Sequence, residues 1–165
     1  MIKQGLAVLL GLALAQGGSG SIQPFDSATF AKIKERYTTE TVLVLIWSLD
    51  CHHCKDGMAR AASLHAKHPD LNLVLVNVDA QEAAPEVERI ISTLRLDSAE
   101  NWQFTDIPAP RLRATIDPEW YGELPRSYLI DDSGKARGFS GRVAPTLLEY
   151  WRQQSLNRDQ GLALE

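Results

Sequence analysis

The sequence predicts an α/β domain with a mixed central sheet and flanking helices. Two apolar runs, at 42–47 and 73–78, consist mainly of Val, Leu and Ile and have the length of strands buried on both faces. Apolar residues recur at helical spacing between these runs, which predicts a right-handed β-α-β unit with parallel strands. Further on, the segments 126–130 and 135–140 flank an Asp-Asp-Ser-Gly turn, which predicts an antiparallel hairpin.

Capping residues and prolines place the other elements. Asp26 and Ser27 can cap a first helix that runs to about Tyr37. The helix between the parallel strands extends from Cys54 to about His65. Later in the chain we expect a helix at 85–96, a short strand at 102–104, a helix at 108–116 and a last helix that begins at Pro145.

Length and composition indicate one soluble domain. The chain has 165 residues, 44% of them hydrophobic and 23% charged, which is enough for a single core. The formal net charge of −4 argues against a nucleic-acid partner and offers no basic patch for an anionic membrane. We divide the chain into a signal peptide at 1–15, a flexible Gly/Ser-containing linker at 16–24, the domain at 25–154 and a loose C-terminal tail at 155–165.

The first residues have the features of a secretory signal peptide. Lys3 precedes an apolar run from Leu6 to Leu14, and Ala13-Leu14-Ala15 fits a small-x-small cleavage site. The run is shorter than the roughly 20 residues that a spanning helix needs, so we expect cleavage near Ala15 and no membrane insertion afterwards. A lipoprotein anchor is excluded because no cysteine follows the run. We therefore expect an exported, periplasmic protein.

Both cysteines of the chain lie in the tetrapeptide Cys51-His52-His53-Cys54, where the first buried strand ends and a helix begins. A C-x-x-C pair can be a redox dithiol, half of a zinc site or a short structural disulfide. The junction favours the redox dithiol, because unpaired N–H groups and the positive end of the helix dipole stabilise a thiolate. A structural disulfide is disfavoured, since closing so short a loop removes little chain entropy.

A zinc finger is the metal-binding alternative, because His65 and His68 complete a C-x2-C-x10-H-x2-H pattern. A helix from Cys54 to His65 separates its two ends by roughly 16 Å, whereas zinc ligands lie about 2 Å from one ion. We therefore expect no metal site there and interpret both histidines as charges at the end of the helix.

The residues around the cysteines follow a known pattern. A buried strand precedes the pair, Trp47 lies four residues before Cys51, and Lys55 directly follows Cys54. This arrangement resembles the thioredoxin superfamily. The resemblance implies a thioredoxin-like fold and a redox-active C-x-x-C pair.

Two positions depart from the thioredoxin pattern. Asp50 stands where thioredoxins usually carry an aromatic residue, and Leu45 stands where they carry a buried acid. The carboxylate of Asp50 disfavours a thiolate at the neighbouring Cys51, and the proton acceptor expected from thioredoxin is missing. We count Asp50 and Trp47 among the residues that tune the site.

The segment 122–141 extends the resemblance, because it contains a proline at the head of a strand, an Asp-Ser-Gly-Lys turn and a glycine after the hairpin. By this resemblance Pro125 is the cis-proline of the fold, and Leu124 and Pro125 contact the substrate. Pro125 lies farther along the chain from Cys54 than in plain thioredoxins, which is similar to the exported TlpA and ResA branch. That branch inserts a helix and a strand before the proline, and its members are mostly reducing. The resemblance covers 25–154.

The pair is expected to act by thiol-disulfide exchange. Cys51, exposed at the start of the helix, is the nucleophile, and Cys54, one turn further in, resolves the mixed disulfide. His52 and His53 would favour the Cys51 thiolate if their imidazoles are protonated or donate a hydrogen bond, whereas Asp50 acts in the opposite direction. As solvated loop residues, the two histidines would have no effect.

We therefore expect an exported thiol-disulfide oxidoreductase without a cofactor. Its partners would be disulfide-containing proteins and a membrane thiol that donates electrons. Two other functions use the same sequence features. One is a copper or zinc carrier that binds metal through Cys51, Cys54 and a histidine between them, since thiolate and imidazole suit Cu(I). The other is a redox-inert peptide-binding module.

Overall fold

The computed structural model describes residues 21–69 and 71–161, and side chains as far as residue 155. The expected signal peptide, most of the linker and residues 162–165 lie outside this part. The elements are β1 (Gln23–Phe25), α1 (Thr29–Arg36), β2 (Val42–Trp47), α2 (His52–His65), β3 (Asn72–Asn77), the 3-10 helix η1 (Gln81–Ala83), α3 (Ala84–Thr93), β4 (Glu100–Phe104), α4 (Ala109–Ile116), β5 (Arg126–Ile130), β6 (Ala136–Ser140) and α5 (Pro145–Gly161).

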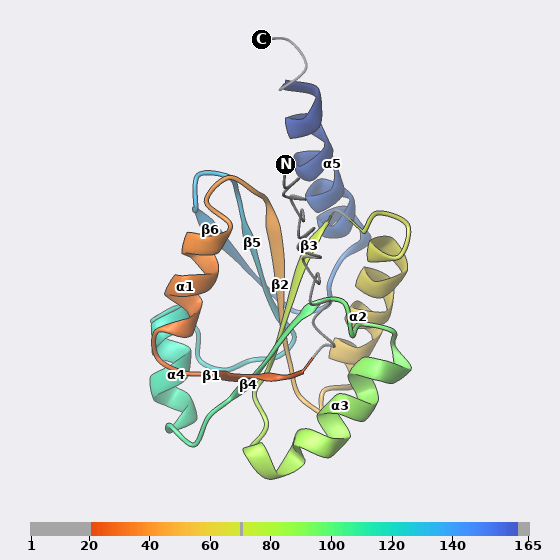
Figure 1. The fold of residues 1–165 in the computed structure, drawn as a ribbon. Coiled ribbons are helices and arrows are strands. Elements are labelled where there is room, and N and C mark those ends of the chain that lie inside the picture. Colours follow the sequence, from red (N-terminus) through yellow and green to blue (C-terminus); the bar gives the residue numbers. More distant parts are fainter. Residues whose placement is uncertain (1–20, 70, 162–165) are drawn as a thin grey trace, which may run out of the picture.

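One mixed sheet runs through the molecule in the order β1-β4-β3-β2-β5-β6 (Figure 1). The strands β1, β4, β3 and β2 run parallel to one another. β5 pairs antiparallel with β2, and β6 pairs antiparallel with β5. The β-α-β unit with parallel strands and the hairpin are thus confirmed, and the two meet at β2 in the middle of the sheet.

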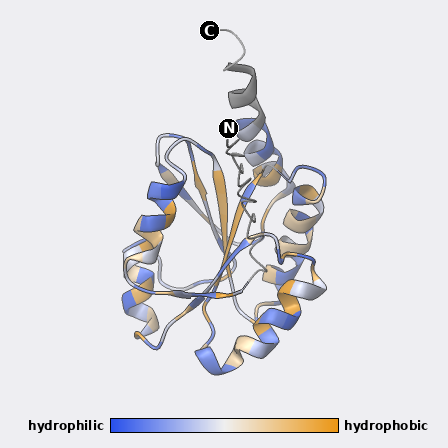
Figure 2. Ribbon diagram, viewed as in Figure 1, coloured by the Kyte–Doolittle hydropathy of each residue, from blue (hydrophilic) through white to orange (hydrophobic). Residues whose placement is uncertain are grey.

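Alternation along the strands divides the core into two clusters, because successive side chains of a strand point to opposite faces. On one face, Leu43, Leu45 and Trp47 of β2 pack with α2, α3 and α5. On the other, Val42, Val44 and Ile46 pack with α1 and α4 (Figure 1). Figure 2 shows the result: the central strands are mostly hydrophobic, and the helices carry hydrophilic residues as well. All six residues of β2 are buried, which explains its continuous apolar sequence.

The antiparallel pairing of β2 with β5 positions the expected cis-proline. Ile46, near the end of β2, lies opposite Arg126, at the start of β5. Pro125 therefore lies at the end of β2 from which the chain continues to Cys51. The Leu124–Pro125 peptide bond is cis, as the resemblance implied.

The largest differences from the sequence-based expectation lie in β1, α3 and the C-terminus. β1 lies partly inside the expected linker and pairs with β4, and its Pro24 is tolerated because β1 is the edge strand. α3 ends at Thr93 rather than near Leu96, since Arg95 adopts a left-handed conformation with φ of 56° and the Leu96 N–H bonds back to the Ile91 carbonyl.

The third difference is at the C-terminus, where a loose tail from residue 155 was expected. α5 instead continues to Gly161. The segment after residue 154 contains no proline, and glycine first occurs at position 161, so no helix breaker stops the last turns earlier.

α3 and β4 occupy the place where a helix and a strand were expected before the cis-proline. Their assignment as an insertion of the TlpA type stays a prediction. Within the described ranges, no helix has both the length and the apolar character that crossing a membrane requires.

Candidate active site

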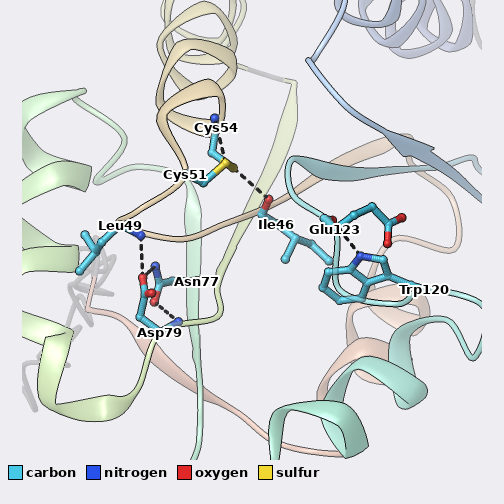
Figure 3. Close-up of a disulfide and its surroundings, with 8 residues drawn as sticks. All are labelled: Ile46, Leu49, Cys51, Cys54, Asn77, Asp79, Trp120 and Glu123. Carbon is cyan, nitrogen blue, oxygen red and sulfur yellow. Dashed lines mark hydrogen bonds between the residues drawn. A yellow bond between two sulfur atoms is a disulfide. The ribbon is translucent and has the colours of Figure 1, made fainter.

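Cys51 and Cys54 form a disulfide at the start of α2, with an Sγ–Sγ distance of 1.99 Å (Figure 3). Cys51 is the N-cap residue of α2, and its sulfur accepts a hydrogen bond from the Cys54 N–H at 3.2 Å. Cys51 is half-buried, whereas Cys54 is only 3% exposed. Cys51 is therefore the more exposed residue of the pair.

Cys54 belongs to the core between α2 and the sheet. Its sulfur lies 4.0 Å from the Ile46 carbonyl oxygen, at the end of β2. Met58, one turn further along α2, is buried in the same cluster. The pair thus combines one half-buried cysteine with one held in apolar surroundings.

The loop that leads into Cys51 is fixed by a side chain from the segment that follows the neighbouring strand β3 (Figure 3). One oxygen of the Asp79 carboxylate accepts hydrogen bonds of 2.8 Å from the Leu49 N–H and from the Asn77 side-chain amide. The Asn77 amide oxygen in turn accepts the Asp79 N–H at 3.0 Å, and Asn77 is fully buried. Asp79 and Asn77 were not among the candidate residues. The only signal for them is their position at the end of β3, the parallel strand beside β2: Asn77 is its last residue and Asp79 follows it.

Asp79→Ala is expected to lower the free energy of unfolding of the oxidised protein by about 1–3 kcal/mol, because the Leu49 N–H and the Asn77 amide lose their acceptor. Urea denaturation measures this change. Asp106→Ala is the matched control, since Asp106 is exposed and a change there should stay within about 0.5 kcal/mol. Equal unfolding free energies for the two variants would contradict the supporting role of Asp79.

The two histidines between the cysteines are exposed, and their rings lie 5.6 Å apart. His53 Nε2 lies 3.4 Å from a guanidinium nitrogen of Arg142, in the loop after β6. Because a guanidinium only donates, this contact uses Nε2 as an acceptor. In this arrangement His53 Nε2 is directed to Arg142 and does not donate to a cysteine sulfur. Arg142 was not foreseen, because it lies far from the cysteines in the sequence.

The remaining tuning candidates, Asp50 and Trp47, differ in their exposure to solvent. Asp50 is exposed next to Cys51. Trp47 is 1% exposed, and its indole N–H has no hydrogen-bond partner among the described residues. Trp47 therefore contributes mainly to packing beneath the disulfide, in the same cluster as Cys54.

The cis-proline loop is anchored on both sides. Pro125 is buried, and its carbonyl accepts the Gly141 N–H at 2.9 Å. The Glu123 carbonyl accepts the indole N–H of Trp120 at 3.0 Å (Figure 3). Leu124 is half-buried and packs against both core clusters. These contacts hold Leu124 and Pro125 in place at the end of β2.

A charged network lies directly after Pro125. The Arg126 guanidinium contacts an oxygen of Asp117 at 2.6 Å and donates to the hydroxyls of Tyr128 and Ser140 at 2.9 and 2.7 Å. Burial alone would raise the pKa of Asp117, but hydrogen bonds from the Glu119 N–H, Tyr128 and Arg126 hold it below its ordinary value. Burial also raises the pKa of Tyr128 to about 12. This network joins β5, β6 and the segment after α4.

The Asp117 carboxylate is expected to make stability fall in acid. A lowered pKa in the folded state gives a stabilisation that is present above the unfolded pKa of about 3.9 and is lost as pH falls through the folded value. Asp117→Asn should therefore flatten the pH dependence of the unfolding free energy below about pH 4. Urea denaturation between pH 2 and 7 measures this, with Asp132→Asn in the exposed β5–β6 turn as control. Parallel profiles for wild type and Asp117→Asn would refute the role of this carboxylate.

No group of three or more His, Cys, Asp or Glu side chains gathers to hold a metal ion within 21–69 and 71–161. α2 spans His52–His65, so about 20 Å of helix separates His65 from Cys51. His65 Nε2 instead lies 3.4 Å from the Ser98 hydroxyl. This geometry agrees with the rejection of a zinc finger.

No family model and no curated protein matches the chain, but solved structures do. A thiol:disulfide interchange protein of the thioredoxin family from Chlorobium tepidum TLS is 16% identical with a TM-score of 0.57, over 74% of this chain and 84% of that one. A putative DsbE from Chlorobium tepidum is 24% identical with a TM-score of 0.52, over 75% and 83%. A secreted disulfide oxidoreductase from Mycobacterium tuberculosis is 13% identical with a TM-score of 0.53, over 74% and 85%. All three identities are below 25%, so the likeness establishes a thioredoxin-like fold.

Proposed function

We propose that this thioredoxin-like chain is an exported thiol-disulfide oxidoreductase that reduces disulfides in protein partners. The observation that carries the proposal is the asymmetric pair at the start of α2, with a half-buried Cys51 and a buried Cys54 in one disulfide, and with the cis-proline at the same end of β2. The three solved structures are described as disulfide interchange or oxidoreductase proteins, which supports this chemistry.

Exchange starts from the reduced pair. The Cys51 thiolate attacks one sulfur of the partner's disulfide, and the partner's other sulfur leaves as a thiolate that takes a proton from solvent. The Cys54 thiol then loses its proton, and its thiolate attacks the Cys51 sulfur. The bond to the partner breaks and the partner's second thiol is released. Two electrons pass from the cysteine pair to the partner, and the pair ends in the oxidised form that the structure shows.

The start of α2 supports the Cys51 thiolate. Cys51 Sγ already accepts the Cys54 N–H at 3.2 Å, and the positive end of the helix dipole favours negative charge at this position. Asp50 opposes this effect, while His52 and His53 act through their protonation or through hydrogen bonds. The roles of Asp50, His52 and His53 in setting the redox potential stay predictions.

Leu124 and Pro125 are proposed to contact the partner. They lie at the end of β2, on the side from which the chain continues to Cys51. An extended partner segment beside Pro125 would present its disulfide to Cys51. This role rests on the thioredoxin-like fold and on the anchoring of the loop by Trp120 and Gly141.

Export and the electron supply complete the proposal. The features of a signal peptide at 1–15 support secretion to the periplasm, where disulfides form and persist. A reductase in that compartment needs electrons from a membrane thiol donor, since no cofactor is proposed. An oxidant would need an electron acceptor instead.

Insulin reduction by dithiothreitol tests the proposal. We expect the protein to accelerate insulin precipitation well above the rate with dithiothreitol alone. The midpoint redox potential of the Cys51–Cys54 pair, measured in glutathione buffers, gives the direction of electron flow. An unchanged precipitation rate would refute the oxidoreductase function, and the peptide-binding module and the metal carrier would remain. Copper titration of the reduced protein then distinguishes these two, because only the carrier binds Cu(I) stoichiometrically.

A further inference from the structure

A groove lies between β6 and the first turns of α5. It encloses about 350 Å³ and is lined by eight residues of β6, α5 and the loop between them: Arg137, Phe139, Ser140, Arg142, Ala144, Thr146, Leu147 and Tyr150. A smaller depression shares Arg137 and Tyr150 and continues toward Lys135 and Gln154. We call both together the β6–α5 groove.

The β6–α5 groove is basic in an acidic chain. Arg137 and Arg142 are exposed, and neither forms an ion pair with a carboxylate in the part of the chain that the structure describes. Lys135 is also exposed, but it lies close enough to Asp131 to help lower the pKa of that carboxyl. The acid in its lining is Asp131, which already accepts hydrogen bonds from Ser133 and from the Lys135 N–H. With a net charge of −4 for the whole chain, this excess of cations favours a negatively charged occupant.

The walls of the groove also offer apolar surface. Tyr150 is 40% exposed and is one of two large hydrophobic side chains that are exposed in the described part of the chain. Phe139 is half-buried beside it, and Leu147 forms the buried floor. An exposed aromatic side chain next to guanidinium groups is typical of protein-binding surfaces. The chemistry thus favours a peptide with both acidic and apolar side chains.

The groove leads to the active site. A guanidinium nitrogen of Arg142, which lines the groove, lies 3.4 Å from His53 Nε2, and His53 directly precedes Cys54 in the sequence. The preceding Gly141 bonds to the carbonyl of Pro125. β6 is the last strand of the sheet, and its outer edge has no strand partner among the described residues, so its backbone is open to an extended segment. A chain bound in the groove would therefore continue toward Cys51.

We infer that the β6–α5 groove docks an acidic segment of the partner protein, with a large apolar side chain that packs on Tyr150. Arg137 and Arg142 contact its carboxylates, and the partner's disulfide lies near Cys51. This inference rests on the proposed function for the identity of the partner, but docking itself can be measured without redox chemistry.

The first test is an NMR titration of the oxidised, ¹⁵N-labelled protein with a cysteine-free peptide, acetyl-Ser-Glu-Leu-Asp-Phe-Ser-amide, and with its Gln/Asn analogue. We expect shift changes at β6 and the start of α5, and binding of the acidic peptide about fivefold to tenfold tighter, as expected for two partly exposed ion pairs. Arg137→Glu should reduce this ratio to about one. Arg111→Glu, an exposed position on α4 at the other face of the sheet, should keep it.

The outcomes separate docking from catalysis. Equal affinities for the two peptides in the wild type, shift changes away from the groove, or an unchanged ratio in both Arg137→Glu and Arg142→Glu would overturn the docking inference. The insulin assay reports independently on the proposed function. A second titration in 0.5 M NaCl should lower the ratio, because salt screens exposed charges, and a salt-independent ratio would also refute the electrostatic docking.

Discussion

Cys51→Ser is expected to reduce catalysed disulfide exchange to the rate of the reductant alone, because it removes the sulfur of the more exposed cysteine. The fold should persist, since Cys51 is the half-buried N-cap of α2 and a serine hydroxyl is itself a good N-cap acceptor. Loss of the disulfide opens a loop of only a few residues, which costs about 2 kcal/mol by the chain-entropy relation. Insulin reduction measures the activity, and circular dichroism with urea denaturation measures the fold.

The control for this experiment is Cys54→Ser, which also lacks the disulfide but keeps the proposed nucleophile. If the loss of the disulfide itself caused the inactivity, neither Cys51→Ser nor Cys54→Ser would form a mixed disulfide, which is the first step of exchange. Only Cys51→Ser should be unable to form a mixed disulfide with a small test disulfide. Insulin reduction at the wild-type rate by Cys51→Ser would remove the basis of the proposed function.

Cys54→Ala is expected to stop exchange at the mixed disulfide. Once the partner is bound to Cys51, no other thiol of the chain can release it, because the sequence contains only two cysteines. Expressed with its signal peptide in the source cell, the variant should accumulate as covalent adducts, several-fold above the wild type, that disappear on reduction. Mass spectrometry of the adducts identifies the partners.

The identity and distribution of the adducts decide between the functions. Adducts to an apocytochrome or a membrane thiol donor would support a reductase, and a broad set of secreted proteins would support a general oxidant. Cys51→Ala is the matched control and should give no adduct. Adducts with Cys51→Ala but not with Cys54→Ala would reverse the two roles. If neither variant forms an adduct, copper binding becomes the function to test.

Most of the fold could be predicted from the sequence, because its main elements carry local signals. β2 and β3 are continuous apolar runs, and the hairpin contains a glycine turn. β1 has only three residues, too few for a pattern to be visible, and it exists because β4 offers a parallel partner. The end of α3 was missed because Arg95, rather than glycine or asparagine, adopts the left-handed conformation.

The candidate site could be predicted only where its residues are close in sequence or match a family pattern. Cys51 and Cys54 are marked by their spacing, and the cis-proline by the thioredoxin pattern around it. Asp79 and Arg142 come from other parts of the chain, and only the pairing of strands brings them to the site. Asp79 then contacts the loop before Cys51, and Arg142 contacts His53. Their roles depend on tertiary contacts, which no local sequence pattern encodes.

The burial of Cys54 in the core couples the redox state of the pair to the stability of the whole domain. Oxidation and folding form a closed thermodynamic cycle. If the disulfide stabilises the native state by a given free energy, folding therefore stabilises the disulfide, relative to the dithiol, by the same free energy. Leu147, Leu148 and Trp151 of α5 belong to the same cluster as Cys54. A substitution in α5 that packs better around one form than the other would shift the midpoint potential without contacting either sulfur.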